Sequence, residues 1–373
     1  MDGFAEKFLC VGDVCLRGRM LHLFRWIMKI FLHLCSLGNF FASPLERQSF
    51  LNVQTQNKRK SLFTIRKFSS RTIITIMHAV GTLAHAKINL GLEVLYKRPD
   101  GYHEINTVFL RVSLADTVLV SSNGTTNAIH LDCTPDLGIA DEENLAYKAV
   151  KKAQEMAAGR GKDVLPSLAM SLRKQIPYGG GLGGGSSNAG AVLRSLPSLW
   201  GREVLTQEEY VNVAASIGSD VPFFLENMDC ALGSGRGEIL KPLALKLPYY
   251  VVVVAPPIRI TTAWAYSALK RASKTEEQRT PTDYAALLPE AIASPNKLRQ
   301  HFTNDFEDVI FAEYPTIGGI KQYLYEAGAL FALMSGSGSS VFGLFKTDTE
   351  ANAVVNAIST RFEGSTAHVC KPF

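Results

Sequence analysis

The sequence predicts an α+β protein of two domains, and three observations support this fold class. The chain has 373 residues, 46% of them hydrophobic, which is enough for two domains with cores of their own. From Met77 onward, segments with strand-like alternation are interspersed with segments of helical apolar spacing. A run of glycines leads directly into one predicted helix. We place the domain boundary at residue 245, so the domains span residues 77–245 and 246–373.

Residues 1–76 form an N-terminal extension that we exclude from both domains. It holds twelve Lys/Arg against four Asp/Glu, and its apolar part, Met20–Ala42, is interrupted by Arg25 and Lys29. A membrane-spanning helix needs ~20 mostly apolar residues, so no clear one is predicted. The extension is expected to be disordered or to reflect a start assigned upstream of Met77. The alternatives are a transit peptide and a membrane-associating segment.

Charge and cysteine usage argue against several classes of protein. The formal net charge of the whole chain is +5, and the extension alone contributes +8, so the remaining residues carry −3. Because this remainder is mildly acidic, no nucleic-acid partner is expected. The six cysteines include no C-x-x-C pair and no metal-ligand spacing. A reduced, cytoplasmic setting is the simplest interpretation.

The elements of the first domain follow from periodicity and turn residues. Alternating apolar and polar residues indicate strands, Pro and Gly indicate turns, and apolar residues four positions apart indicate a helix. We predict a strand region at Gly81–Val94, a turn at Lys97–Gly101, strands at Ile105–Leu114, Asp116–Ser121, Ala128–Cys133 and Ser167–Ile176, and a helix at Asn144–Ala158.

Two more helices are predicted before the domain boundary. Ser186 or Ser187 is expected to cap a helix that Pro197 ends early or kinks. Thr206–Glu209 has the pattern of a capping box, and Gly218 is expected to end the helix that it opens.

The second domain begins with an entirely apolar segment, Tyr249–Ala255, which is typical of a strand buried on both faces. Further elements are predicted from the same periodicities, with a Gly/Ser loop between the last two strands. They are a helix at Thr316–Ala327, strands at Ala329–Met334 and Ser340–Phe345, and a helix at Thr349–Arg361.

The glycine run Pro177–Ala189 is the most informative motif. Six glycines in seven positions let a backbone approach a ligand closely and leave its N–H groups free, and the helix that follows adds its N-terminal N–H groups. This combination predicts an anion site, most often for phosphate. The run lacks the Gly-Lys-Ser/Thr ending of a P-loop and the context of a dinucleotide-binding loop. The alternative is a flexible linker.

Lys87 and Asp220 have ordinary interpretations when each is considered alone. Lys87 alternates with apolar residues, as on the solvated face of a strand, and Asp220 precedes Val221-Pro222, as a helix cap does. Four strings in one order change this interpretation. They are Ala86–Leu90, Pro177–Ala189, Gly218–Phe224 and Leu333–Phe342. Together they resemble the motifs of the GHMP kinases, a family that phosphorylates small alcohols such as galactose, homoserine and mevalonate.

The resemblance implies a two-domain fold, with an N-terminal ATP-binding α/β domain and a C-terminal, substrate-binding α+β sandwich domain. It implies that Asp220 is the general base, that Lys87 keeps it ionised and offsets phosphoryl charge, and that ATP enters with Mg²⁺. The expected ATP-binding residues are Pro177, Tyr178, Gly179, Gly180, Gly181, Leu182, Gly183, Gly184, Gly185, Ser186 and Ser187. No metal ligand is identified. The Gly336–Ser339 loop is expected to border the site, or else to be a plain turn.

Two further strings, Pro99–His103 and Asn304–Glu307, resemble the branch of the family whose alcohol carries a cytidine diphosphate. The resemblance implies that His103 reads the cytosine edge and that Tyr102 stacks on the base. It implies that Asn89 lies near the reacting hydroxyl. Tyr266 is the second expected aromatic residue. Trp264 is close enough in sequence to compete with it for this role, and a place in the core is the alternative for Tyr266.

The alternatives at this level are a GHMP kinase for another alcohol and a catalytically inactive nucleotide-binding relative. The expected partner is a small-molecule substrate, with no nucleic acid and no stable membrane contact. The expected assembly is a monomer or a weak homodimer.

Overall fold

Two β-sheets organise the protein. The computed structural model describes residues 9–11, 14–16, 78–269 and 279–373. Within the N-terminal extension it describes two short antiparallel strands, β1 (Leu9–Val11) and β2 (Val14–Leu16). The predictions for the rest of the extension, Met20–Ala42 included, lie outside the described residues.

The larger sheet is built on two long strands, β3 and β4, which pair antiparallel along almost their whole length. The other strands extend it in the order β5-β6-β4-β7-β8, and only β5 and β6 are parallel. Its strands are β3 (His78–Lys97), β4 (His103–Asn123), β5 (Ile129–Thr134), β6 (Ser167–Arg173), β7 (Cys230–Ser234) and β8 (Ile239–Pro242).

The predicted break between Ile105–Leu114 and Asp116–Ser121 is wrong, because β4 is continuous. Its register with β3 shifts between His85 and Ala86, whose partners are Ala115 and Val112. A bulge of this kind interrupts the alternation of apolar residues without ending the strand.

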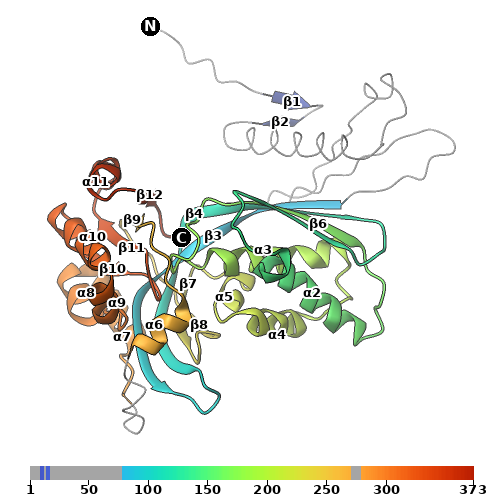
Figure 1. Cartoon of the computed structure of the whole chain (residues 1–373), viewed down its shortest axis with the longest axis horizontal. Helices are drawn as coiled ribbons and strands as arrows, with labels where there is room; N and C mark the ends of the chain where they lie inside the picture. The colour runs from blue at the N-terminus through green and yellow to red at the C-terminus, as the bar shows by residue number, and fades with distance from the viewer. Residues whose placement is uncertain (1–8, 12–13, 17–77, 270–278) are drawn as a thin grey trace.

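Helices cover one face of this sheet (Figure 1). A core of Ala, Val and Leu side chains fills the space between them and β3, β4 and β6. The elements are the 3-10 turn η2 (Asp141–Glu143), α2 (Leu145–Ala158), α3 (Gly184–Leu199), α4 (Gln207–Ile217) and the short α5 (Val221–Leu225).

Two of these helices test the predicted boundaries. The Thr206 capping box is confirmed, and Gly218 follows α4 as its C-cap. Pro197 does not end α3 early, because it lies in the last turn, which the Trp200 N–H closes on the Leu196 carbonyl at 2.8 Å. A proline there removes one hydrogen bond but leaves the final one intact.

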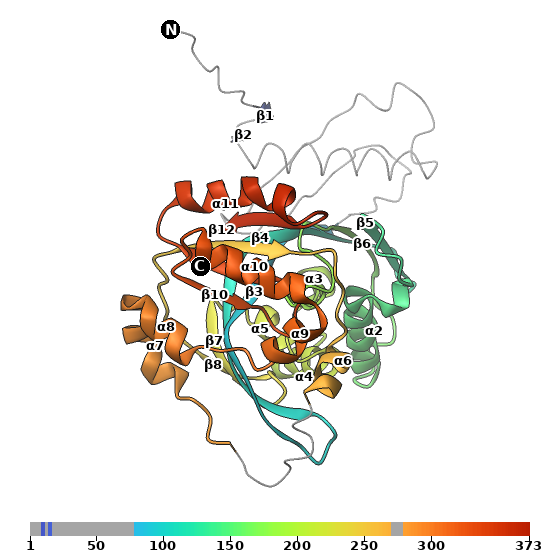
Figure 2. The ribbon, with the colours of Figure 1, turned by 60° about the vertical axis from the view of Figure 1, so that its left-hand side comes forward.

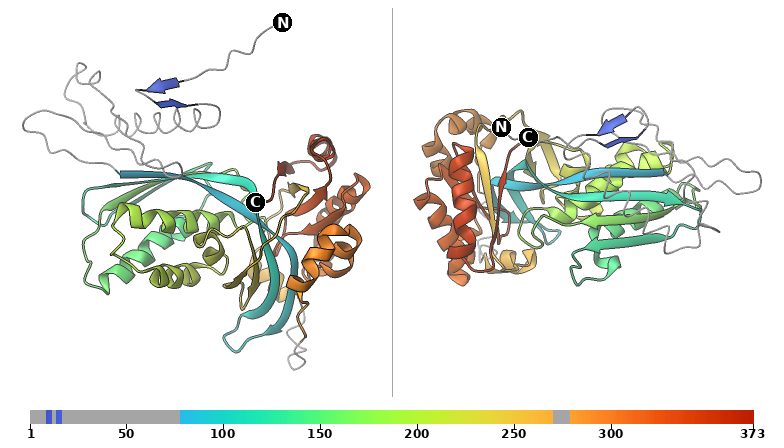
Figure 3. Two further views of the ribbon diagram at one scale, coloured as in Figure 1. Left: turned by 180° about the vertical axis from the view of Figure 1, so that it is seen from behind. Right: turned by 90° about the horizontal axis from the view of Figure 1, so that it is seen from above.

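The smaller sheet is antiparallel, in the order β10-β11-β9-β12. Its helices α10 and α11 form an outer layer at one end of the molecule, as the view from above in Figure 3 shows. This part of the chain contains β9 (Tyr250–Ala255), α6 (Thr262–Ala268), α7 (Tyr284–Ala293), α8 (Pro295–His301), α9 (Glu307–Glu313), α10 (Pro315–Glu326), β10 (Phe331–Met334), β11 (Val341–Phe345), α11 (Asp348–Arg361) and β12 (Thr366–Cys370).

The apolar composition of β9 follows from its position, since both of its faces are covered. Val252 and Val254 pack toward the outer helices, whereas Val251 and Val253 pack toward β3 and β4. The core that contains Val251 and Val253 also contains Ile88 and other side chains of the larger sheet, so the two sheets share one apolar layer. The chain passes from one sheet to the other between Pro242 and Tyr250; the domain boundary at residue 245 stays a prediction.

The long β3–β4 pair therefore belongs to both halves of the molecule. Its turned end, at residues 98–102, projects beside α6, as Figure 2 shows. Among the helices that the structure describes, none combines the length and the apolar character needed to span a membrane.

Candidate active site

A cavity of about 860 Å³ lies where the two sheets meet. Its wall is formed by the middle of β3, the β3–β4 turn, the glycine run, the N-terminus of α5, α6 and the β10–β11 loop. Every residue predicted to serve in catalysis, ATP binding or substrate binding lines this cavity, with the exception of Ser187. Ser187 is 1% exposed and is not part of the described wall.

The glycine run forms one side of the cavity. Gly179, Gly181 and Gly183 have φ angles of 75°, 75° and 69°, which favour glycine. Helix α3 begins at Gly184 with Gly183 as its N-cap, so the predicted cap by Ser186 or Ser187 is wrong. The first N–H groups of α3 have no partner within the helix, and residues 183–186 face the cavity. This arrangement suits an anionic ligand.

The β10–β11 loop holds the glycine run from the other side. The Ser340 N–H donates to the Gly180 carbonyl and the Ser335 hydroxyl donates to the Gly181 carbonyl, both at 3.1 Å. A Cβ atom on Gly181 would lie 2.1 Å from the Ser335 carbonyl oxygen. The loop is thus more than a plain turn, because it meets the glycine run backbone to backbone.

Lys87 and Asp220 form an ion pair at the cavity, with Lys87 Nζ 3.3 Å from Asp220 Oδ2. Lys87 Nζ also donates to Asn89 Oδ1 at 2.7 Å, and the Asn89 amide donates to the Thr107 hydroxyl at 2.7 Å. Lys87 and Asn89 are 4% and 1% exposed, so the alternative of a solvated strand face is wrong for both. Asp220 is the N-cap residue of α5, but its side chain makes no capping hydrogen bond.

The other end of the cavity is aromatic. The rings of His103 and Tyr266 stack with centroids 4.7 Å apart, and burial, together with Lys97, lowers the pKa of His103. Tyr102 is half exposed and lies under the Arg236 guanidinium, 4.6 Å away. Trp264 packs on Tyr314 and is not part of the described wall, so of the two candidates Tyr266 is the one that reaches the cavity.

The charge of the cavity wall suits a polyphosphate. Lys87, Lys97, Lys174 and Arg236 face it, and Asp220 is the one carboxylate among the wall residues that the structure describes. Within the described part of the chain, no group of three or more His, Cys, Asp or Glu side chains is arranged to hold a metal ion.

Sequence reasoning missed a buried network behind the glycine run. Asp116 on β4 is fully buried and accepts hydrogen bonds from the N–H groups of Gln175 and Ile176, from Lys174 Nζ and from the Asn188 amide. Three of these partners precede the run and Asn188 follows its glycines, so Asp116 ties its two ends together. No local pattern signals this role, because the contact spans more than 55 residues.

A second missed network holds the β10–β11 loop. The Asn304 amide donates to the Met334 and Gly336 carbonyls at 2.7 and 2.8 Å, and Glu307 accepts the Met334 N–H at 2.9 Å. The Asp305 side chain accepts the Val94 N–H. The string Asn304–Glu307 thus joins β3 to the loop that meets the glycine run.

Comparisons with known proteins agree with this geometry. The model of the GHMP kinases N terminal domain matches residues 144–227, and the GHMP kinases C terminal model matches residues 286–364. A relative named 4-diphosphocytidyl-2-C-methyl-D-erythritol kinase, from Pelodictyon phaeoclathratiforme, is 40% identical over 283 residues, which are 76% of this chain and 94% of the relative. One of the same name from Chlorobium chlorochromatii is 39% identical over 280 residues, 75% of this chain and 93% of that protein.

The chain belongs to the 4-diphosphocytidyl-2-C-methyl-D-erythritol kinase family of GHMP kinases. A crystal structure titled 4-(cytidine 5'-diphospho)-2C-methyl-D-erythritol kinase superposes with a TM-score of 0.62 at 34% identity, covering 78% of this chain and 98% of that one. The predicted family and fold class are thereby confirmed. Lys87 and the Tyr102–His103 pair lie outside both matched models, so the models bear on the glycine run, Asp220 and the β10–β11 loop.

Proposed function

We propose that this protein transfers the γ-phosphoryl group of ATP to the 2-hydroxyl of 4-diphosphocytidyl-2-C-methyl-D-erythritol, a step of the non-mevalonate route to isopentenyl diphosphate. The observation that carries the proposal is that one cavity joins the Lys87–Asp220 pair to an aromatic end. Family membership supports the same activity.

The mechanism follows from the charged pair. Asp220 accepts the proton of the substrate hydroxyl as the oxygen attacks phosphorus, which makes a poor nucleophile competent. The Lys87 ammonium has three N–H donors. Its contacts with Asn89 and Asp220 account for two of them and leave one for the transferred phosphoryl group. Asn89 orients the ammonium, because the Asn89 amide is itself held in place by donating to the Thr107 hydroxyl.

ATP is placed by backbone groups. Residues 179–186 offer N–H groups before and at the start of α3, and Lys174, whose ammonium is paired with the buried Asp116, lies in the wall beside them. ATP supplies the phosphoryl group, and Mg²⁺ offsets the charge on its oxygens. We propose that Mg²⁺ enters with ATP and draws most of its ligands from phosphate and water, since the described wall offers one carboxylate.

The base end determines which alcohol reaches Asp220. At neutral pH the His103 imidazole is uncharged because its pKa is lowered, so one ring nitrogen can donate to the cytosine edge while the other accepts. Tyr102 and Tyr266 provide ring faces for the base. A small aliphatic alcohol would use none of these groups.

The remaining assignments are proposals of the same kind. Residues 77–245 would bind ATP and carry the catalytic pair, and residues 246–373 would complete the substrate site. The protein would act in the cytoplasm as a monomer or a weak homodimer, and the N-terminal extension would be dispensable for catalysis.

The test is ADP release by the purified full chain with ATP, Mg²⁺ and, in parallel, the cytidyl substrate, mevalonate or homoserine. We expect ADP only with the cytidyl substrate, and the same result from residues 77–373. ADP with mevalonate or homoserine would refute the roles of Tyr102, His103 and Tyr266. A folded protein that binds ATP but releases no ADP with any alcohol would indicate an inactive relative.

A further inference from the structure

The β3–β4 turn, which holds Tyr102, is tied internally by charge. The Arg98 guanidinium donates to both carboxylate oxygens of Asp100, at 3.1 and 3.3 Å, and Asp100 accepts the Tyr102 N–H at 3.1 Å. The Arg98 N–H donates to the Tyr102 carbonyl at 2.7 Å. These contacts fix the shape of the turn but leave open where it points relative to the cavity.

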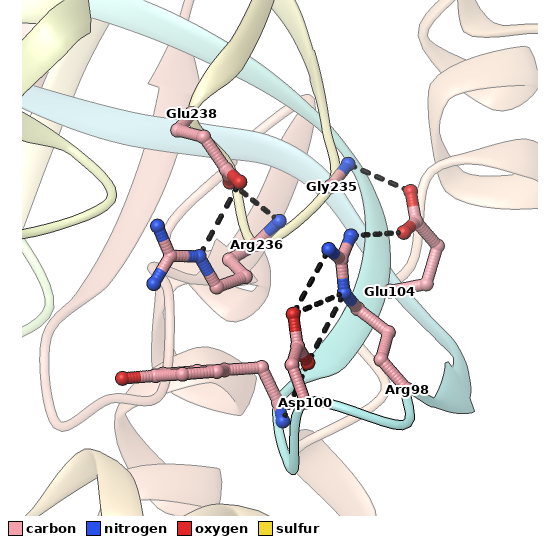
Figure 4. Close-up of polar contacts among 7 residues, drawn as sticks. Arg98, Asp100, Glu104, Gly235, Arg236 and Glu238 are labelled. Carbon is pink, nitrogen blue, oxygen red and sulfur yellow. Dashed lines mark hydrogen bonds and ion pairs between the residues drawn. The ribbon is translucent and has the colours of Figure 1, made fainter. Parts of the chain in front are cut away.

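Glu104 connects this turn to another hairpin. One carboxylate oxygen accepts Arg98 Nη1 at 2.9 Å, and the other accepts the N–H of Gly235, in the turn between β7 and β8, at 2.7 Å. Figure 4 shows the Arg98 guanidinium between the carboxylates of Asp100 and Glu104, with the Gly235 nitrogen at the second oxygen of Glu104. The Ile105 N–H adds a backbone bond to the Gly235 carbonyl at 2.8 Å.

The partner turn supplies the cation that faces Tyr102. Arg236 directly follows Gly235, and its guanidinium lies 4.6 Å from the centroid of the Tyr102 ring. Glu238 accepts both the Arg236 N–H and its Nε, which sets the direction of that side chain. Tyr102 and Arg236 both line the cavity, whereas Arg98, Asp100 and Glu104 are not part of the described wall.

We propose that Glu104 is a positioning residue for recognition of the nucleotide end of the substrate. By bridging Arg98 to Gly235 it aligns the turns of two neighbouring hairpins, β3–β4 and β7–β8, and so holds the Tyr102 ring against the Arg236 guanidinium at the cavity wall. A flat base beside a diphosphate is the ligand chemistry that such a ring and cation suit. This inference rests on the proposed function, and it adds a selectivity device that does not touch the ligand.

The experiment compares Glu104→Ala, Glu104→Gln and Tyr102→Ala with the wild-type full chain. We expect Glu104→Ala to raise KM for the cytidyl substrate and Kd for CDP about tenfold, equivalent to about 1.4 kcal/mol. The values of kcat and of KM for ATP should stay within about twofold. Glu104→Gln keeps an acceptor for Gly235 but loses the charge that pairs with Arg98, so an intermediate effect is expected. Glu326→Ala, which removes an exposed ion pair with Arg361 on α11, is the control and should change neither constant.

A double-mutant cycle separates positioning from general stability. If Glu104 acts through Tyr102, Tyr102→Ala with Glu104→Ala is no worse than Tyr102→Ala alone. Additive losses, unchanged constants in Glu104→Ala, or equal increases in KM for both substrates would overturn the proposal. CDP binding by calorimetry needs no turnover, so it tests the positioning role of Glu104 separately from the proposed kinase activity. A wild-type chain that neither binds CDP nor uses the cytidyl substrate refutes the proposed function itself, and this inference with it.

Discussion

At the scale of single residues, Lys87 is held in place from several directions. Asn89 and Asp220 take its ammonium, the Phe109 ring lies 5.2 Å from Nζ, and its own N–H donates to the Leu182 carbonyl of the glycine run. One residue thus connects the nucleophile side of the site to the phosphate side. A lysine oriented in this way keeps little rotamer freedom to lose when the reaction begins.

Asp220→Asn tests the role of the base. The amide retains the shape of the side chain but cannot accept the substrate proton, so kcat should fall by about 10²–10⁴. The Kd for ATP should stay within about twofold, because the backbone groups of residues 179–186 are unchanged. Asp229→Asn is a matched control, since Asp229 pairs with Arg111 outside the described cavity wall. Near-normal turnover of Asp220→Asn would rule out this role.

The acidity of His103 predicts a pH effect on one substrate only. Burial lowers its pKa below the ordinary 6.5, so the ring is neutral above that pH and becomes protonated as pH falls through the lowered value. Protonation removes the acceptor nitrogen. KM for the cytidyl substrate should be flat above pH 6.5 and rise as the pH falls through the lowered pKa of His103, whereas KM for ATP should not follow. Steady-state kinetics of wild type and His103→Gln check this, and the variant should lose the dependence.

Residue roles were predictable from the sequence only where a motif carries them. Lys87 and Asp220 are unremarkable in isolation, and only the order of the four strings distinguished them. Asp116 has no motif, and its four donors come from residues 174–176 and 188, so only folding brings them together. Glu104 also has no motif that reveals its role, because its decisive contact is with Gly235, which lies 131 residues away in the sequence.

At the scale of elements, the glycine run and the β10–β11 loop depend on each other. Each has positive φ angles, and they approach so closely that Gly181 has no room for a side chain. The glycines are therefore required both by conformation and by contact. The two requirements can be separated by experiment.

Gly181→Ala should cost more than its backbone conformation alone explains. An alanine at positive φ costs about 1–2 kcal/mol, and here its Cβ would also meet the Ser335 carbonyl at 2.1 Å. We expect weaker ATP binding and a lower free energy of unfolding. Gly161→Ala is the matched control, because Gly161 has a φ of 73° and a Cβ added to it would have no neighbouring atom within 4 Å. Equal losses in the two variants, measured by thermal unfolding and ATP titration, would contradict the contact argument.

Element prediction succeeded where the local signals are strong. The capping box at Thr206, the buried strand β9 and helices α2, α10 and α11 follow from local patterns. The strands β7, β8 and β12 and the bounds of helices α5 to α9 were not predicted. Most of them span seven residues or fewer, which is too short for a period to emerge, and packing on neighbours determines them instead.

At the scale of the whole molecule, the shared apolar layer makes the two halves interdependent. Val251 and Val253 of β9 pack in one core with Ile88 of β3. Neither half can bury this surface alone, so the protein should unfold as one cooperative unit despite its two sheets.

Ile88→Ala tests this coupling. Ile88 is fully buried, and truncating such a side chain should lower the free energy of unfolding by about 3 kcal/mol. Urea unfolding followed by near- and far-ultraviolet circular dichroism should give coincident transitions in wild type and variant, with the midpoint lowered. Residues 246–373 expressed alone should not fold. A folded, cooperative fragment, or transitions that separate, would show that the halves are independent.

The continuity of β3 and β4 has a consequence for substrate length. Lys87 and the turn that holds Tyr102 lie on one continuous strand pair, whose register shifts between Asn89 and Gly91 and between Val94 and Tyr96. The number of strand residues between Lys87 and the turn therefore sets the span from base to reacting hydroxyl. The length of the strand pair thus fixes the distance between the turn and Lys87. Adding two residues to each strand would move the turn by up to ~7 Å while every side chain kept its face, whereas adding one would invert them. Kinases of this architecture could thus be retuned to longer or shorter nucleotide-linked alcohols in steps of two residues, with the chemistry at Asp220 untouched.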